Sequence, residues 1–174
     1  MLDRGAESPG TDRNSILKKI RILLVVFIVG LVLSGVTALA LETELTWLSD
    51  LLLKPVAIDQ SFYSSFYIWI VRIRMGLHET NARYPFIAYG TDWLAFAHIV
   101  IAILFVGPLM DPVRNNWIIR FGLIACVLVI PFAFICGTVR EIPLGWKLID
   151  CSFGILGFVV LALVWRLIRK LDSV

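Results

Sequence analysis

The two histidines of the chain, His78 and His98, fall in residues 77–112, where a polar and aromatic segment leads into an apolar helix. His98 follows Thr91, the expected start of this helix, by seven residues, which is a depth of roughly 10 Å at about 1.5 Å per residue. An ionisable side chain at such a depth in a membrane usually faces neighbouring helices and has a partner. Two hypotheses follow. In the first, His98 has a function: it ligates haem, binds a quinone or relays protons. In the second, it has a structural role and joins two helices through one hydrogen bond.

Other side chains with possible chemistry are expected on one face of the membrane. Asp92 and Asp150 fall at predicted helix starts, where the helix dipole favours negative charge. The pattern fits a site that binds a lipid headgroup, a small ligand or a partner protein, and it fits helix caps and surface salt bridges equally well. The candidate binding residues are His78, Glu79, Arg83, Asp92, His98, Arg140 and Asp150.

No catalytic template accompanies these residues. The sequence holds no HExxH, no GxSxG and no paired acidic motif. We therefore assign no catalytic residue and no metal site, and the sequence leaves open whether the chain is an enzyme, with the balance against one. An enzyme acting on a membrane lipid through Asp92, His78 or Asp150 is the least supported hypothesis.

The cysteines allow one covalent cross-link. Cys136 and Cys151 flank a predicted outer loop of fourteen residues, at the end of one span and the start of the next. They form a disulfide in an oxidising compartment if they lie at the same depth, and are otherwise two buried free thiols. Cys126 lies in mid-span and is expected to be a small apolar filler.

The composition defines the elements that must position these groups. Of 174 residues, 59% are hydrophobic and only 17% are charged, which lies outside the range of soluble domains. The net charge of +3 is small and scattered, so no nucleic-acid partner is indicated. We predict an all-α integral membrane protein whose first partner is the lipid bilayer.

Four apolar stretches are long enough to span a bilayer. The predicted spans cover residues 20–41, 91–110, 117–136 and 146–168, within a single membrane domain of residues 16–174. Residues 1–15 are polar and are expected to form a disordered cytoplasmic tail. The long loop between the first two spans holds residues 44–53 and 62–77, which predict one or two helices lying in the outer membrane interface.

Basic residues orient the chain. With both termini inside, ten of the sixteen lysines and arginines fall on the inner side, as expected for a protein with cytoplasmic termini. We expect the plasma membrane of a bacterium.

The sequence therefore favours two functional hypotheses. The first is a non-enzymatic accessory protein whose polar outer face binds another membrane protein or a lipid headgroup. The second is a membrane redox protein that binds haem or a quinone through His98, which would be the cofactors to look for.

Overall fold

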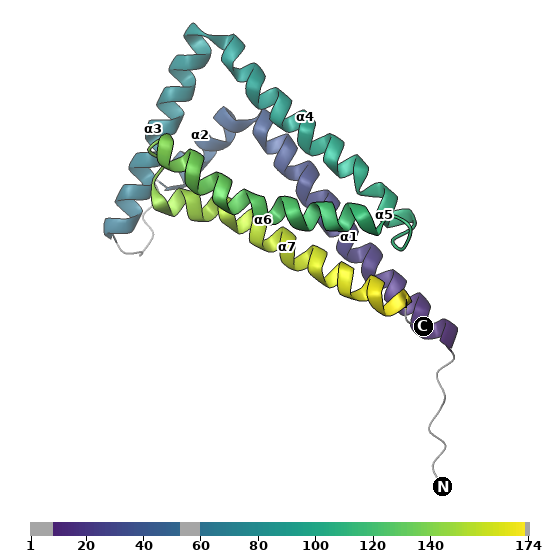
Figure 1. The fold of residues 1–174 in the computed structure, drawn as a ribbon. Helices are drawn as coiled ribbons and strands as arrows, with labels where there is room; N and C mark the ends of the chain where they lie inside the picture. Colours follow the sequence, from purple (N-terminus) through teal and green to yellow (C-terminus); the bar gives the residue numbers. More distant parts are fainter. Residues whose placement is uncertain (1–8, 53–59, 173–174) are drawn as a thin grey trace. The chain divides into compact units, whose positions relative to one another are not determined.

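The computed structural model describes residues 9–52 and 60–172, and they are helical apart from short connections. The helices in chain order are α1 (Pro9–Leu39), α2 (Leu41–Leu52), α3 (Gln60–Arg83), the 3₁₀ helix η1 (Pro85–Ala88), α4 (Tyr89–Leu104), α5 (Val106–Met110), α6 (Asn116–Val139) and α7 (Leu144–Asp172) (Figure 1). The chain divides into two compact units, one of Leu31–Ile101 and one of Met1–Gly30 with Ala102–Val174.

Four helical stretches within the described residues are long and apolar enough to cross a membrane, which confirms the number predicted from the sequence. They are Arg13–Leu39, Pro85–Met110, Asn116–Val139 and Leu144–Leu171. Their exposed surfaces are covered with large apolar side chains, such as Val25, Phe121 and Leu156. Such surfaces suit a hydrocarbon environment better than water.

The first span starts earlier than expected. Helix α1 begins at Pro9 and runs through Ser15, so residues 9–15 are helical rather than disordered. Proline is well suited to a first turn, because its missing N–H would have no partner there. The rest of the predicted tail, residues 1–8, lies outside the described residues.

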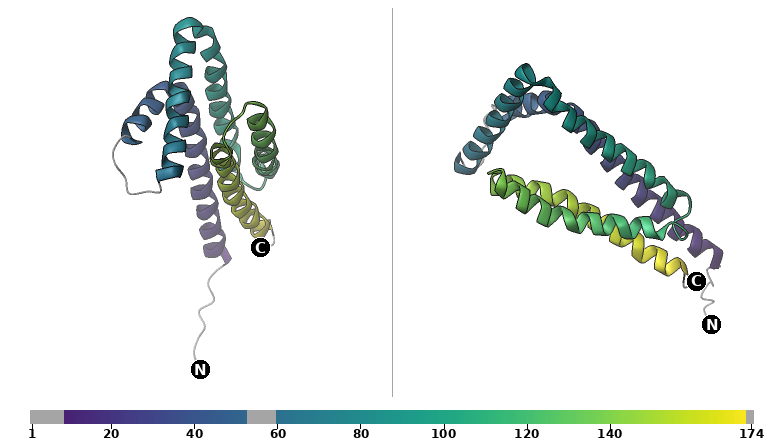
Figure 2. Two further views of the ribbon diagram at one scale, coloured as in Figure 1. Left: turned by 90° about the vertical axis from the view of Figure 1, so that its left-hand side faces the viewer. Right: turned by 45° about the horizontal axis from the view of Figure 1, so that its top comes forward.

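In the unit formed by Met1–Gly30 and Ala102–Val174, large apolar side chains of the core pack closely against a glycine. Helices α6 and α7 run side by side in opposite directions (Figures 1 and 2). A Cβ added at Gly122 would lie 2.6 Å from Leu161 Cδ1 and 2.8 Å from Phe105 Cζ. The Phe105 ring contacts Phe27 of α1, with 4.7 Å between ring centroids. Glycine at position 122 is therefore what admits the two large side chains to the α6 backbone.

Two prolines act differently in this unit. Pro108 has no N–H to offer the carbonyl of Leu104, and the α-helix is interrupted there, between α4 and α5. Pro131 lies inside α6, and the helix continues through it to Val139.

The connection between α6 and α7 is much shorter than predicted. It comprises residues 140–143, whereas the predicted spans leave residues 137–145 between them and the two cysteines flank fourteen residues, because α6 continues past Cys136 and α7 begins before Trp146. The N–H groups of Glu141 and Ile142 donate to the carbonyls of Thr138 and Gly137, at 3.2 and 2.8 Å. Glu141 has a φ of 56°. These are the two hydrogen bonds and the left-handed residue of a Schellman motif, and Pro143 follows it, as is common after helix ends.

In the unit Leu31–Ile101, α2 packs against α3 through residues spaced on one face of each helix. Leu45 and Ser49 of α2 are buried, and Ile70 of α3 is completely buried. Helices α2 and α3 overlap residues 44–53 and 62–77, of which residue 53 lies outside the described residues, and α3 extends six residues beyond residue 77. Whether the two helices lie in the membrane interface stays a prediction.

Candidate functional site

Polar side chains join the start of α2 to the end of α3. The carboxylate of Glu42 accepts a hydrogen bond from Asn81 Nδ2 at 2.8 Å through Oε2, and its Oε1 lies 3.0 Å from His78 Nδ1. The hydrogen bonds from His78 and then from Asn81 lower the pKa of Glu42 below its usual value of 4.5. The carboxylate therefore stays ionised and holds the two helices at this end.

A second polar contact joins the same helices farther along. The Arg74 guanidinium donates to Ser49 Oγ at 3.0 Å, and this hydroxyl donates to the carbonyl of Thr46 at 2.8 Å. Ser49 is only 1% exposed, so its hydroxyl needs both partners to offset the cost of leaving water. Together the two contacts fix the register of an antiparallel hairpin, which we call the α2–α3 hairpin (Leu41–Leu52 and Gln60–Arg83).

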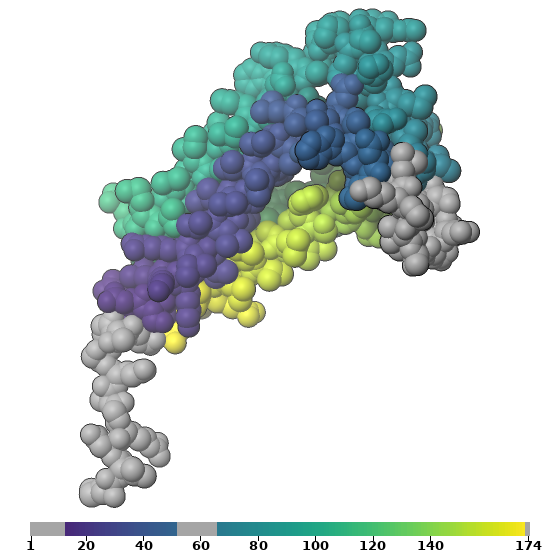
Figure 3. Space-filling model, turned by 180° about the vertical axis from the view of Figure 1, so that it is seen from behind, coloured from purple at the N-terminus to yellow at the C-terminus, as the bar shows by residue number. Residues whose placement is uncertain are grey.

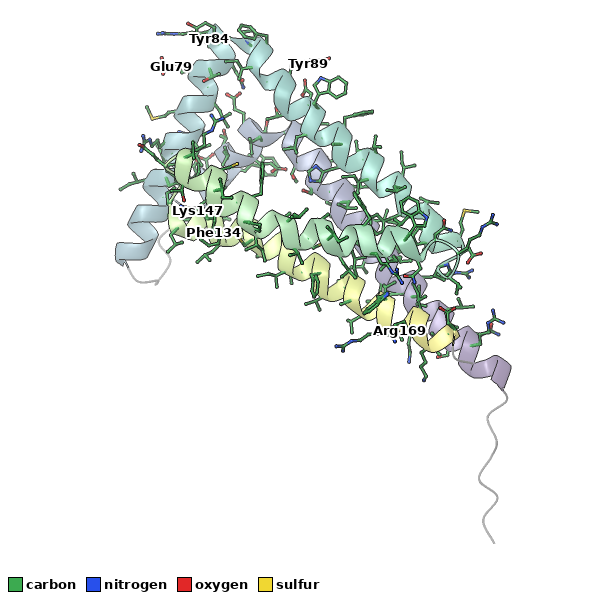
Figure 4. The ribbon with its side chains drawn as sticks, in the orientation of Figure 1. Glu79, Tyr84, Tyr89, Phe134, Lys147 and Arg169 are labelled. Atoms are coloured by element: carbon green, nitrogen blue, oxygen red, sulfur yellow. The ribbon has the colours of Figure 1, made fainter. Side chains whose placement is uncertain are left out.

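The α2–α3 hairpin contains three of the seven candidate residues, but they point in different directions. His78 is committed to Glu42, whereas Arg83 Nη2 pairs with Glu79 Oε1 at 3.5 Å, one helical turn apart on α3. Both side chains of that pair are more than two-thirds exposed, and Glu79 can be found near the end of α3 in Figure 4. An exposed pair of this kind stabilises little and forms no enclosed site.

His98 lies on α4, half-buried. Its Nδ1 is 2.8 Å from the carbonyl of Leu94 in its own helix, so this hydrogen bond does not join two helices. If this nitrogen carries the proton, Nε2 keeps a free lone pair. A Cβ added at Gly35 of α1 would lie 3.1 Å from His98 Cβ and 3.0 Å from the carbonyl of Ala95. The lack of a side chain at Gly35 is therefore what lets α1 approach α4 at the histidine.

Asp92 is exposed in the first turn of α4, as expected from the helix dipole. Thr91 is not the predicted N-cap: the helix begins at Tyr89, and the Thr91 hydroxyl donates back to the carbonyl of Ala88 at 2.6 Å. The start of α4 is instead marked by aromatic rings, with Tyr89 and Trp93 edge to face at 5.9 Å. Figure 4 shows Tyr84 and Tyr89 on either side of η1, at the corner between α3 and α4.

Arg140 and Asp150 belong to the other unit. Arg140 is the exposed C-cap residue of α6. Asp150 does not cap α7, because the helix begins at Leu144 and its first hydrogen bonds reach back to the carbonyl of Pro143. Next to them, Lys147 lies across Gly137, and its Nζ donates to Thr138 Oγ1 at 3.1 Å (Figure 4 labels Lys147).

Cys136 and Cys151 are free thiols in the structure, the first exposed and the second buried. The short turn explains why they do not meet. Lys147 lies opposite Gly137, and Gly154 lies opposite Cys126 and Val129. In this register Cys151 is displaced from Cys136 by about one helical turn, roughly 5 Å along the axis.

Sequence reasoning missed the residues that hold the α2–α3 hairpin together: Glu42, Ser49, Arg74 and Asn81. One signal was available. Glu42, Leu45 and Ser49 share one helical face, as do Ile70, Arg74, His78 and Asn81. Polar residues spaced along an otherwise apolar face indicate a helix partner.

No group of three or more histidine, cysteine or acidic side chains suited to a metal ion occurs among the described residues. No protein family, curated protein sequence or solved structure matches the chain.

Proposed function

We propose that the chain is an integral membrane protein of non-enzymatic, accessory type that binds another membrane protein through the exposed face of its α2–α3 hairpin. The proposal places both termini in the cytoplasm and the hairpin on the outer side of a bacterial plasma membrane. The excess of basic residues on the inner side supports this orientation.

The observation that carries the proposal is a stripe of exposed side chains on α3. Ile68, Arg72, Met75 and Glu79 recur at helical spacing, and Ile68 and Met75 are each 64% exposed. Helix α3 is not one of the four candidate spans. Its exposed apolar groups are therefore not explained by a helix that crosses the bilayer.

The composition of this stripe favours a protein over a lipid surface as its partner. Methionine and arginine are enriched at protein interfaces, and Arg72 lies 5.9 Å from the ring centroid of Trp69, which orders its side chain. The salt-bridged Glu79 and Arg83 add charge of both signs at one end. A helix that lies on lipid would instead present an unbroken apolar face.

The polar contacts of the hairpin supply rigidity. Glu42 with His78 and Asn81 and Ser49 with Arg74 fix the two helices against each other. A preformed surface loses less conformational entropy when it binds.

Site-specific photo-crosslinking in native membranes tests the proposal. A photoreactive amino acid at Ile68 or at Met75 should give an adduct with one and the same membrane protein. The matched control is Leu156 of α7, which is 65% exposed within a candidate span and should give lipid adducts. Met75→Glu should abolish co-purification of the partner.

Two results would contradict the proposal. Lipid adducts alone at both α3 positions would mean that the hairpin lies on the membrane surface. Different proteins at the two positions would indicate random collisions.

A redox function through His98 is the second candidate. It is favoured by the bond from His98 to the Leu94 carbonyl, because a bond at one imidazole nitrogen orients the ring and leaves the other nitrogen for a ligand. A visible absorption spectrum of the purified protein, oxidised and dithionite-reduced, tests it. Haem would give a Soret band that His98→Leu removes, and a flat spectrum would exclude haem in the purified protein.

A further inference from the structure

A hollow of about 510 Å³ lies where three segments of one unit meet: the start of α1, the turn between α5 and α6, and the end of α7. Figure 3 shows the first half of α1 (purple) beside the end of α7 (yellow). Arg13 and Arg21 line the hollow from α1, and Arg114 lines it from the turn. Three arginine residues therefore border one space.

These guanidinium groups are not consumed by ion pairs. The salt bridges found among the described residues, Glu42–His78 and Glu79–Arg83, involve none of them. Two aspartates also line the hollow, and Asp111 is engaged locally, since its Oδ1 accepts the backbone N–H of Arg114 at 3.0 Å. The other aspartate is Asp172. Because three arginines face two aspartates, the lining has a net positive charge. Arginine is the side chain best suited to hold phosphate oxygens.

The hollow adjoins a second one of different character. A groove of about 560 Å³ follows α1 and shares Leu17 and Arg21 with the first hollow. Besides the shared residues, it is lined by Asn14 and Lys18 near the start of α1 and by the apolar side chains of Ile22, Val25 and Val26 farther along the helix. A charged hollow that continues into an apolar groove matches a molecule with a charged head and a hydrocarbon tail.

The position of the hollow fits the level of lipid headgroups. Arg13, Met110 and Leu171 all line it, and each is the terminal residue of a candidate span. The ends of spanning helices lie where hydrocarbon gives way to headgroups. Basic pockets between such helices bind anionic headgroups in other membrane proteins.

We propose that this hollow binds the phosphate headgroup of an anionic phospholipid, with one acyl chain in the groove along α1. Arg13, Arg21 and Arg114 contact the phosphate, and Ile22, Val25 and Val26 contact the chain. The site is separate from the α3 stripe, so either proposal can fail without the other.

Native mass spectrometry of the detergent-purified protein with added phosphatidylglycerol measures this binding. The triple variant Arg13→Gln, Arg21→Gln, Arg114→Gln should bind the lipid roughly 100-fold more weakly, about fivefold for each arginine. The control triple Arg120→Gln, Arg166→Gln, Arg169→Gln removes the same charge from exposed positions that do not line the hollow. It should retain nearly full affinity.

Two further variants separate a loss of lipid binding from a failure to fold and from an effect of the α3 stripe. If the glutamine triple does not fold, the lysine triple at positions 13, 21 and 114 keeps the charge and should still bind more weakly, because an ammonium cannot make the paired bonds of a guanidinium. Met75→Glu should leave lipid binding unchanged.

Three outcomes would overturn the proposal. Equal loss in both glutamine triples would mean a diffuse basic surface rather than a site. Equal affinity for zwitterionic phosphatidylcholine would refute selectivity for anionic lipid. Full competition by soluble glycerol phosphate would identify a water-soluble phosphate as the ligand and leave the groove without a role.

Discussion

Replacing Gly154 by alanine tests the packing of α6 against α7. An added Cβ would lie 2.7 Å from the carbonyl oxygen of Cys126 and 3.3 Å from Val129 Cβ. Ordinary contacts begin at 3.4 Å, so the two backbones would have to separate locally by about 0.7 Å. The nearest obstacle is backbone and cannot turn away as a side chain can. Overpacking of this kind costs about 1–3 kcal/mol.

The matched control is Gly30→Ala in α1, where an added Cβ has nothing within 4 Å. Both substitutions gain about 1 kcal/mol of helix propensity, and this gain cancels when the two variants are compared. Gly154→Ala should therefore be less stable than Gly30→Ala by about 1–3 kcal/mol. Unfolding of the detergent-solubilised protein by increasing SDS, followed by tryptophan fluorescence, gives the difference. Equal stability of the two variants would refute the close approach of the helices at Gly154.

Three further predictions concern the turn, the hairpin and the cysteines. Glu141→Gly should stabilise the protein by up to about 1 kcal/mol in the same SDS assay, because glycine adopts the φ of 56° without strain; a loss of stability would contradict the left-handed conformation. Glu42 has a lowered pKa, so its contribution to stability is complete above the unfolded value of 4.5 and is lost as the pH falls through the lower folded value; melts from neutral to acidic pH should show this loss in the natural protein and not in Glu42→Gln. A maleimide should label the exposed thiol of Cys136 rapidly and the buried thiol of Cys151 only after unfolding, as mass spectrometry of the labelled protein would show.

The spans could be predicted because their signal is local. A stretch of about 20 apolar residues identifies a spanning helix whatever surrounds it, and all four were found. The ends of the spanning helices were predicted less accurately. Helix α6 continues three residues past the predicted end at residue 136, and α7 begins at Leu144, two residues before the predicted start at residue 146. Lys147 is accommodated because Gly137 leaves room for its stem and Thr138 accepts its hydrogen bond.

The candidate site could be predicted only in part, because its contacts join residues far apart in the chain. The sequence singled out His78 but not its partner Glu42, which lies 36 residues away. In the same way, Arg114 has no sequence relation to Arg13 and Arg21, although all three line one hollow. A single sequence contains the helical faces but not their pairing, and the pairing creates the sites.

The four-residue connection between α6 and α7 has a consequence for how the protein is made. Only residues 140–143 separate two apolar helices, so in the proposed membrane topology almost no polar chain has to pass through the bilayer between them. The charges of Arg140 and Glu141 are opposite in sign and next to each other, which lowers the cost of their transfer. The proposed topology therefore predicts that the two helices enter the membrane together as one hairpin, already joined by their contacts at Gly137 and Gly154.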